Sequence, residues 1–274
     1  MRRHHERAGI TPGANPPPER TRREQLNVAG GAGLFEPKLV PRLSVVIPVL
    51  NEERNVRPLC QEVREALESR LSYEIIFVDD GSTDKTVAMI RSLMKDGRVR
   101  LLRHSERRGQ SAAIRTGVRA ASGRWIATLD GDGQNDPRDL LELWQLVTAT
   151  DVEVGLVNGI RETREDGHLK RVASRIANRV RGTVLSDGCP DSGCGIRVFA
   201  RDAFLDLPSF DHMHRFLPAL FRARGHEVLQ VPVHHRPRRY GLSKYGIRDR
   251  LWVGIVDLIG VAWLGRRSRS MIED

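Results

Sequence analysis

The sequence of 274 residues has few of the features that mark membrane-spanning or disulfide-bonded proteins. No uninterrupted apolar run reaches the ~18–20 residues that span a bilayer. The longest run, LWVGIVDLIGVAWLG at 251–265, is short and contains Asp257. No apolar stretch follows the N-terminus, so no signal peptide is expected. The three cysteines, Cys60, Cys189 and Cys194, have no metal-ligand spacing, which favours free thiols in a reducing compartment.

Several ligand-binding signatures are also missing. The sequence has no zinc finger, no RNA-binding aromatic signature and no helix-turn-helix pattern, so nucleic acid is not an expected partner. It has neither the GxGxxG fingerprint of Rossmann dehydrogenases nor a Walker A sequence. The net charge of +10 lies mainly at the ends, with +3 over residues 1–40 and +5 over residues 236–274. This distribution suggests anionic partners there, such as a membrane surface.

Three regions follow from composition and periodicity. Residues 1–40 are rich in Pro, Gly and charge and lack apolar periodicity, so we expect a disordered basic arm. Residues 43–235 alternate between predicted strands and helices, which indicates one α/β domain with a mostly parallel sheet flanked by helices. Residues 236–274 combine a basic loop with an apolar tail. The predicted strands are 43–50, 73–80, 99–104, 125–130, 152–160, 196–199 and 226–235, and the predicted helices in the first half are 52–70, 82–95, 110–121 and 137–147.

We expect residues 1–40 to be dispensable for catalysis, because they lack the apolar side chains needed to pack on a domain. A truncated chain that starts at Pro41 should keep the turnover number of the full chain. Circular dichroism and a transfer assay check this prediction together. A truncated protein that stays folded but loses turnover would show it to be wrong.

Acidic side chains follow the predicted strands at one edge of the sheet. TLDGDGQNDP at 128–137 places Asp130 and Asp132 two residues apart, so in an extended chain both point to the same side. Two close carboxylates repel unless a hard divalent cation lies between them. An EF-hand calcium loop is excluded, because Asn135 and Leu141 stand where that loop needs Gly and Glu. A solvated acidic turn is the remaining alternative, although a buried strand leads directly into the motif.

Six motifs, in order along the chain, carry a resemblance to a known family. They are VVIPVLNEE (45–53), VDDGSTDKT (78–86), RRGQSAAIRTGVRAASG (107–123), LDGDGQNDP (129–137), DSGCGIRVF (191–199) and RPRRYGLSKYG (236–246). Together they look like the inverting family-2 glycosyltransferases of GT-A fold. The last motif resembles the dolichyl- and polyprenyl-phosphate sugar transferase branch, which includes dolichol-phosphate mannosyltransferases. The resemblance covers about residues 43–250.

The resemblance implies a Rossmann-like GT-A domain and a set of site residues. The nucleotide would be lined by Pro48, Glu52, Asp79, Asp80, Gly109, Gln110 and Asp130. Asp130, Asp132 and Gln134 would bind a Mg²⁺ or Mn²⁺ ion together with the diphosphate. Asp191 matches the acidic residue beside the acceptor, so the expected catalytic residues are Asp191 and Asp132. The acceptor and phosphate residues would be Arg197, Arg238, Ser243 and Lys244, to which the chemistry of two phosphorylated substrates adds Arg161 and Arg164.

The activity implied is the transfer of a hexose, with inversion, from a GDP- or UDP-sugar to a dolichyl or undecaprenyl phosphate. The lipid-linked product would serve cell-envelope glycan or glycolipid synthesis. Gly131, Gly133 and Asn135 differ from the residues more usual in dolichyl enzymes, which leaves the sugar open. A lipid phosphate is largely ionised at neutral pH, with a second pKa of ~6. Asp191 could therefore act as a base or orient the site.

Two alternatives stay open at this point. One is a glycosyltransferase that acts on a polysaccharide or glycolipid hydroxyl, and the other is a non-catalytic sugar-nucleotide sensor. The basic RRYGLSK element argues against the first, because a neutral acceptor does not need that charge. The intact Asp130, Asp132 and Asp191 argue against the second. The sequence does not decide whether a homo-oligomer or a membrane-protein partner is involved.

The tail is expected to form a helix over 246–264 that lies in the membrane interface, at the cytoplasmic face. Trp252 and Trp263 are eleven residues apart, which places them on nearly the same helix face. Aromatic anchors and flanking basic residues are typical of interfacial helices. The flanking arginines are Arg248, Arg250, Arg266, Arg267 and Arg269. The paired C-terminal membrane helices of many bacterial members are not seen in the sequence. The alternative to an interfacial helix over 246–264 is a helix that packs on the domain itself or forms a dimer seam.

Overall fold

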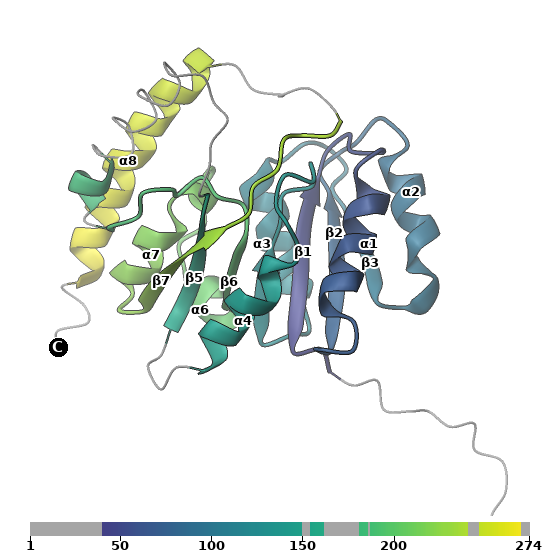
Figure 1. Ribbon diagram of the computed structural model, residues 1–274. Helices are drawn as coiled ribbons and strands as arrows, with labels where there is room; N and C mark the ends of the chain where they lie inside the picture. The colour runs from purple at the N-terminus through teal and green to yellow at the C-terminus, as the bar shows by residue number, and fades with distance from the viewer. Residues whose placement is uncertain (1–39, 150–153, 162–180, 186, 241–246, 270–274) are drawn as a thin grey trace, which may run out of the picture. The chain divides into compact units, whose positions relative to one another are not determined.

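The fold is built on a seven-stranded sheet with helices on both faces (Figure 1). The computed structural model describes residues 40–149, 154–161, 181–185, 187–240 and 247–269. The strands are β1 (Leu43–Val49), β2 (Tyr73–Asp79), β3 (Val99–Arg103), β4 (Trp125–Thr128), β5 (Val154–Arg161), β6 (Arg197–Ala200) and β7 (Glu227–Val233). Their order in the sheet is β3-β2-β1-β4-β6-β5-β7. Only β6 runs antiparallel to its neighbours in this sheet, so the predicted mostly parallel sheet is confirmed.

Two hydrophobic cores lie on opposite faces of the sheet. The helices are α1 (Val56–Leu67), α2 (Thr86–Leu93), α3 (Gln110–Ala120), α4 (Asp139–Ala149), α6 (Arg201–Leu205), α7 (Leu217–Ala223) and α8 (Ile247–Arg269), with 3-10 turns at Met94–Asp96 and Met213–Arg215. One core joins the sheet to α1, α2 and α4, and the other joins it to α3, α6 and α7. Neighbouring residues of β1 alternate between them, with Val45 and Ile47 in the first core and Val46 in the second. Burial on both faces explains the continuous apolar sequence of this strand.

Three helices begin later than the sequence predicts. Helix α1 begins at Val56, four residues after the predicted start. In front of the other two, α2 and α4, acidic side chains bond to the preceding turns. Helix α2 begins at Thr86, although the sequence predicts that it begins at Ser82. The Asp84 carboxylate accepts the Thr86 N–H at 2.9 Å and its hydroxyl at 2.5 Å. Helix α4 begins at Asp139, although Pro137 was expected to be its first residue. The Asp136 carboxylate accepts the Arg138 N–H at 3.0 Å. Such local side-chain bonds compete with helix formation.

The sequence also favours a left-handed helix end at Gly123, because glycine is common at the position after a helix, but this prediction is wrong. Helix α3 ends at Ala120, the next residue Ala121 has an extended backbone, and Gly123 is not among the described residues with positive φ. Its N–H donates to the Ser44 hydroxyl at 2.9 Å. A Cβ at this position would lie only 2.8 Å from that oxygen, so the glycine allows a close approach to β1.

Helix α8 packs on the domain with one side and exposes apolar side chains on another. Val261 is buried and Leu258 contacts the core around α7. Val256, Ile259 and Trp263 are 66%, 65% and 56% exposed. The predicted tail helix is thus present and continues to Arg269, while the side chain of Trp252 lies outside the described residues. None of the helices that the structure describes combines the length and apolar content needed to cross a bilayer.

The predicted free cysteines are confirmed. Cys60, Cys189 and Cys194 are all unpaired and buried. The predicted basic arm at 1–40 lies, apart from Val40, outside the described residues.

Candidate active site

A cavity of about 620 Å³ opens at the edge of the sheet where β1 and β4 end. Parallel strands end at a common edge, which is where α/β sheets bind ligands. Strand β6 runs antiparallel to β4 and therefore begins at this edge, which brings residues 192–195 and Arg197 into the cavity wall. The wall also includes the start of α3, Arg238, and four residues before α7: Asp211, His212, His214 and Arg215.

Asp130 and Asp132 lie on the loop after β4. The Asp130 N–H donates to Asn135 Oδ1 at 2.9 Å, and Gln110 Nε2 donates to Asp130 Oδ1 at 2.9 Å. Burial, and then the charge of Asp132, raise the pKa of Asp130 to about 6. Asp132 accepts the Gln134 N–H at 3.1 Å and Arg238 Nη2 at 2.6 Å. The two carboxylates are therefore close enough to repel, and a cationic group already lies beside one of them.

This pair fits a magnesium or manganese ion. Mg²⁺ is usually held by one or two carboxylates together with water and substrate phosphates. In the described part of the chain, no group of three or more His, Cys, Asp or Glu side chains could hold a metal alone. An ion bound here would thus depend on the diphosphate of a nucleotide. The Gln134 side-chain nitrogen lies 3.4 Å from His235 Nε2 and from the Arg236 carbonyl oxygen, in contact with the basic segment after β7.

The predicted acceptor-side residues Asp191 and Arg161 form a bidentate ion pair. Arg161 Nε and Nη2 donate to Asp191 Oδ2 and Oδ1, each at 2.7 Å. The Arg161 N–H adds a bond to Oδ2 at 3.2 Å. Paired bonds of this geometry fix the orientation of both groups. Asp191 is only 5% exposed, so its carboxylate is held in one place beside the cavity.

Arg197 contributes a buried cation to the cavity wall. Arg197 is the first residue of β6 and is 2% exposed. Nε donates to Asn158 Oδ1 and Nη2 donates to the Ser192 carbonyl oxygen, each at 2.7 Å. Burial lowers the pKa of this guanidinium. The other predicted basic and polar residues Arg164, Ser243 and Lys244 lie outside the described residues.

The predicted nucleotide residues fall into two groups. Pro48, Gly109, Gln110 and Asp130 line the cavity, while Glu52, Asp79 and Asp80 are buried and are not among its lining residues. Asp80 accepts the N–H groups of Arg108 and Gly109, both at 2.8 Å. Gly109 has φ +90° at the start of α3, which favours glycine. Asp80 therefore shapes the loop that precedes α3.

Glu52 and Asp79 also make internal contacts. Glu52 Oε2 accepts Asn55 Nδ2 at 2.6 Å. Asp79 Oδ1 accepts the Ser82 N–H at 3.2 Å and Oδ2 accepts Arg103 Nε at 3.4 Å. These contacts hold the loops after β1 and β2 in place.

Sequence reasoning missed a Ser–His pair in the cavity wall. Ser111 Oγ lies 2.7 Å from His214 Nδ1 and accepts the His214 N–H at 3.2 Å. Burial, followed by the charges of Arg197 and Arg215, lowers the pKa of His214 well below its ordinary value. The ring is thus neutral at neutral pH. The two residues are 103 positions apart in the chain, and no local pattern marks them as partners.

Comparison with known proteins identifies the family. Residues 44–207 match the family model described as Glycosyl transferase family 2. The chain belongs to glycosyltransferase family 2. This glycosyltransferase is 34% identical over 248 residues to the dodecaprenyl-phosphate galacturonate synthase of Rhizobium johnstonii, covering 88% of this chain and 72% of the relative.

Solved structures show the same fold. The glycosyltransferase resembles glucosyl-3-phosphoglycerate synthase from Mycobacterium tuberculosis in complex with Mg²⁺ and UDP, with a TM-score of 0.61 and 19% identity over 81% of this chain and 78% of that chain. A complex of the same enzyme with Mn²⁺, UDP and glucosyl-3-phosphoglycerate gives a TM-score of 0.60 and 20% identity over the same shares. The predicted family and GT-A fold are therefore confirmed.

Proposed function

We propose that the protein transfers a sugar, with inversion, from a nucleotide-diphosphate sugar to a polyprenyl phosphate. The observation that carries this proposal is the 2.6 Å contact between Arg238 and Asp132. It brings the basic element after β7 to the aspartate pair, where a diphosphate leaving group and an acceptor phosphate would meet. The activity named for the rhizobial relative supports the same reaction.

The roles of the site residues follow from their chemistry. Asp130 and Asp132 would hold Mg²⁺ or Mn²⁺, which when bound neutralises the charge of the leaving diphosphate. Arg238 would bind phosphate oxygens. A phosphate oxygen of the acceptor forms the bond to the anomeric carbon as the bond to the diphosphate breaks. Asp191, fixed by Arg161, would orient the acceptor, because a lipid phosphate with a second pKa of ~6 needs no base at neutral pH.

We infer that the transferred sugar is a hexuronic acid, as in the name of the rhizobial relative. Arg197 supports this inference. Among the described residues its hydrogen-bond acceptors are two neutral oxygens, those of Asn158 and Ser192. A buried cation is stabilised by anionic groups. The charges of Asp130 and Asp191 act on Arg197, and a sugar carboxylate in the cavity would add an anionic hydrogen-bond partner.

A donor panel tests both parts of the proposal. The protein is incubated with polyprenyl phosphate, Mg²⁺ and either UDP-galacturonate, UDP-galactose, UDP-glucose or GDP-mannose. We expect lipid-linked product with UDP-galacturonate and much less with its neutral counterpart UDP-galactose. Preference for a neutral donor would overturn the hexuronic assignment alone. Absence of lipid-linked product with every donor would count against the reaction itself.

We further propose that α8 attaches the protein peripherally to the cytoplasmic face of a membrane, where a polyprenyl phosphate presents its headgroup. Val256, Ile259 and Trp263 form an exposed apolar stripe. The exposed Arg266 and Arg267 follow it, and the Arg267 guanidinium lies 5.1 Å from the Trp263 ring centroid. Each arginine near an anionic leaflet contributes about 1 kcal/mol. An aromatic and apolar stripe that ends in arginines is typical of an interfacial helix.

Replacing both Ile259 and Trp263 by glutamate should weaken membrane binding, because it removes apolar anchors and adds negative charge. Flotation with anionic vesicles at low salt measures the effect. The wild type should float, the double variant should remain largely in the soluble fraction, and its circular dichroism should be unchanged. Met94→Glu is the control, since Met94 is 39% exposed on a turn away from α8. A wild type that does not float would contradict the attachment.

A further inference from the structure

A segment after β7, residues 234–240, crosses the loop of the aspartate pair and reaches α1; we refer to it as the strap. At its start, the backbone N–H of His234 donates to Asp139 Oδ2 at 2.8 Å, and His234 Nδ1 lies 2.7 Å from Asp139 Oδ1. In its middle, the Arg236 N–H donates to the Gln134 carbonyl at 2.8 Å. At its end, the Tyr240 carbonyl accepts Asn55 Nδ2 at 3.4 Å. The strap is therefore tied to α4, to the metal loop and to α1.

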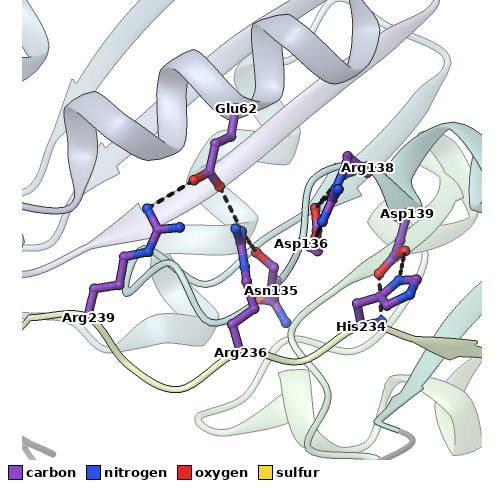
Figure 2. A network of polar contacts seen from close by, with 8 residues as sticks. All are labelled: Glu62, Asn135, Asp136, Arg138, Asp139, His234, Arg236 and Arg239. Atoms are coloured by element: carbon purple, nitrogen blue, oxygen red, sulfur yellow. Dashed lines mark hydrogen bonds and ion pairs between the residues drawn. The ribbon is translucent and has the colours of Figure 1, made fainter.

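The three arginines of the strap are divided between two carboxylates. Arg236 Nη2 donates to Glu62 Oε2 at 2.7 Å, and Arg239 Nη1 donates to Glu62 Oε1 at 3.2 Å. Figure 2 shows both guanidinium groups pointing to Glu62 from the strap below α1. Arg238, which lies between them in the chain, instead reaches Asp132.

Glu62 is placed to act on the strap and does not touch the cavity. It belongs to α1 and is absent from the residues that line the cavity. Its side chain and that of Arg236 are each 24% exposed, so the pair is partly shielded from water. Arg236 Nη2 also donates to the Asn135 carbonyl at 2.9 Å. Through this arginine, Glu62 is linked to the loop that carries Asp130 and Asp132.

Removing the Glu62 charge would leave the three arginines of the strap, which lie within four residues, with Asp132 as the carboxylate that binds one of them. Positive charges so near to one another repel. Arg236 and Arg239 would then be free to approach Asp132 or the substrate phosphates, in competition with Arg238. The ordered strap avoids this competition by keeping two of its cations on α1.

We propose that Glu62 is a positioning residue that holds Arg236 and Arg239 on α1 and so directs Arg238 alone to the place where the acceptor phosphate binds. This inference rests on the proposed function for the identity of the acceptor. In this way Glu62, a residue of α1 outside the cavity, would increase the affinity of the protein for the lipid phosphate.

The test compares Glu62→Gln with Glu65→Gln. Glu65 is on the same helix, and its carboxylate accepts Gln61 Nε2 at 2.9 Å, away from the strap. Glu62→Gln should raise the KM for polyprenyl phosphate by about tenfold, the effect of ~1.4 kcal/mol, with kcat and the KM for the nucleotide sugar nearly unchanged. Glu65→Gln should match the wild type. Glu62→Asp keeps the charge and should restore part of the acceptor affinity.

Hydrogen exchange of residues 234–240 provides a second measurement that needs no acceptor. Exchange should be faster in Glu62→Gln than in Glu65→Gln. Equal exchange in the two variants, or an equal KM for the acceptor, would overturn the positioning role. A loss of kcat together with a lower thermal transition would show a structural role instead. If the wild type transfers no sugar to polyprenyl phosphate, the proposed function fails, while the exchange measurement still decides whether Glu62 orders the strap.

Discussion

Replacing Asp132 by asparagine should lower kcat by about 10²–10³-fold, equivalent to ~3–4 kcal/mol of transition-state stabilisation, by analogy with the loss of other electrostatic groups. Asp132 is one of two carboxylates that would hold the metal at the leaving diphosphate. The amide keeps the shape of the side chain but loses the charge. The developing charge on the diphosphate would then be poorly neutralised.

The Asp132→Asn result is read from both kinetic constants. Because the ion pair with Arg238 is also lost, the KM for the acceptor is measured with kcat, and a dominant loss in kcat indicates a transition-state effect. Asp202→Asn is the control, since the Asp202 side chain is 89% exposed in its ion pair. Full turnover of the wild type in excess EDTA, or an Asp132→Asn enzyme with wild-type kcat, would contradict the metal role.

Gly195→Ala should be almost as damaging, although the change is one methyl group. A Cβ at Gly195 would overlap the Asp130 carboxylate, with Oδ1 only 2.7 Å away. The backbone cannot retreat easily, because the Gly195 carbonyl accepts the Thr128 hydroxyl of β4 at 2.8 Å. Asp130 would have to turn away from its position. A displacement of about 1 Å in a catalytic group can cost 10²-fold in rate.

The measurements for Gly195→Ala are kcat and the affinity for Mn²⁺ in the presence of UDP, and both should fall. Gly260→Ala is a matched control, because no other group lies within 4 Å of a Cβ at this position. The Mn²⁺ affinity is determined on folded protein, which separates loss of the site from loss of the fold. A Gly195→Ala enzyme that keeps both its Mn²⁺ affinity and its turnover would contradict the close packing of Asp130.

The sequence predicts the sheet and the acidic edge of the site because both depend on local patterns. The apolar residues of β1 form one continuous run, and Asp130 and Asp132 follow β4 directly in the chain. The end of each strand, and the carboxylates that follow β4, can therefore be located from the sequence. Helix starts are less predictable, since Asp84 and Asp136 can bond either to a helix end or to the turn before it. At both places the turn is formed.

The partners of the site residues are less predictable, because they are brought together only by the fold. Asp191 and Arg161 are 30 residues apart, and Glu62 and Arg236 are 174 apart. In the sequence, Glu62 is indistinguishable from other acidic residues on an amphipathic helix. The packing of α1 against α4, and the path of the strap between the loop after β4 and α1, give Glu62 its two arginine partners.

The central claim is transfer to a phosphate at the end of a polyprenyl chain, and acceptor discrimination tests it most directly. The protein, Mg²⁺ and the best donor of the panel are incubated with polyprenyl phosphate or with the dephosphorylated polyprenol of the same length. We predict a glycosyl phospholipid from the phosphate, with inverted anomeric configuration by NMR, and no product from the alcohol. Equal transfer to the alcohol, or retention of the anomeric configuration, would contradict the account.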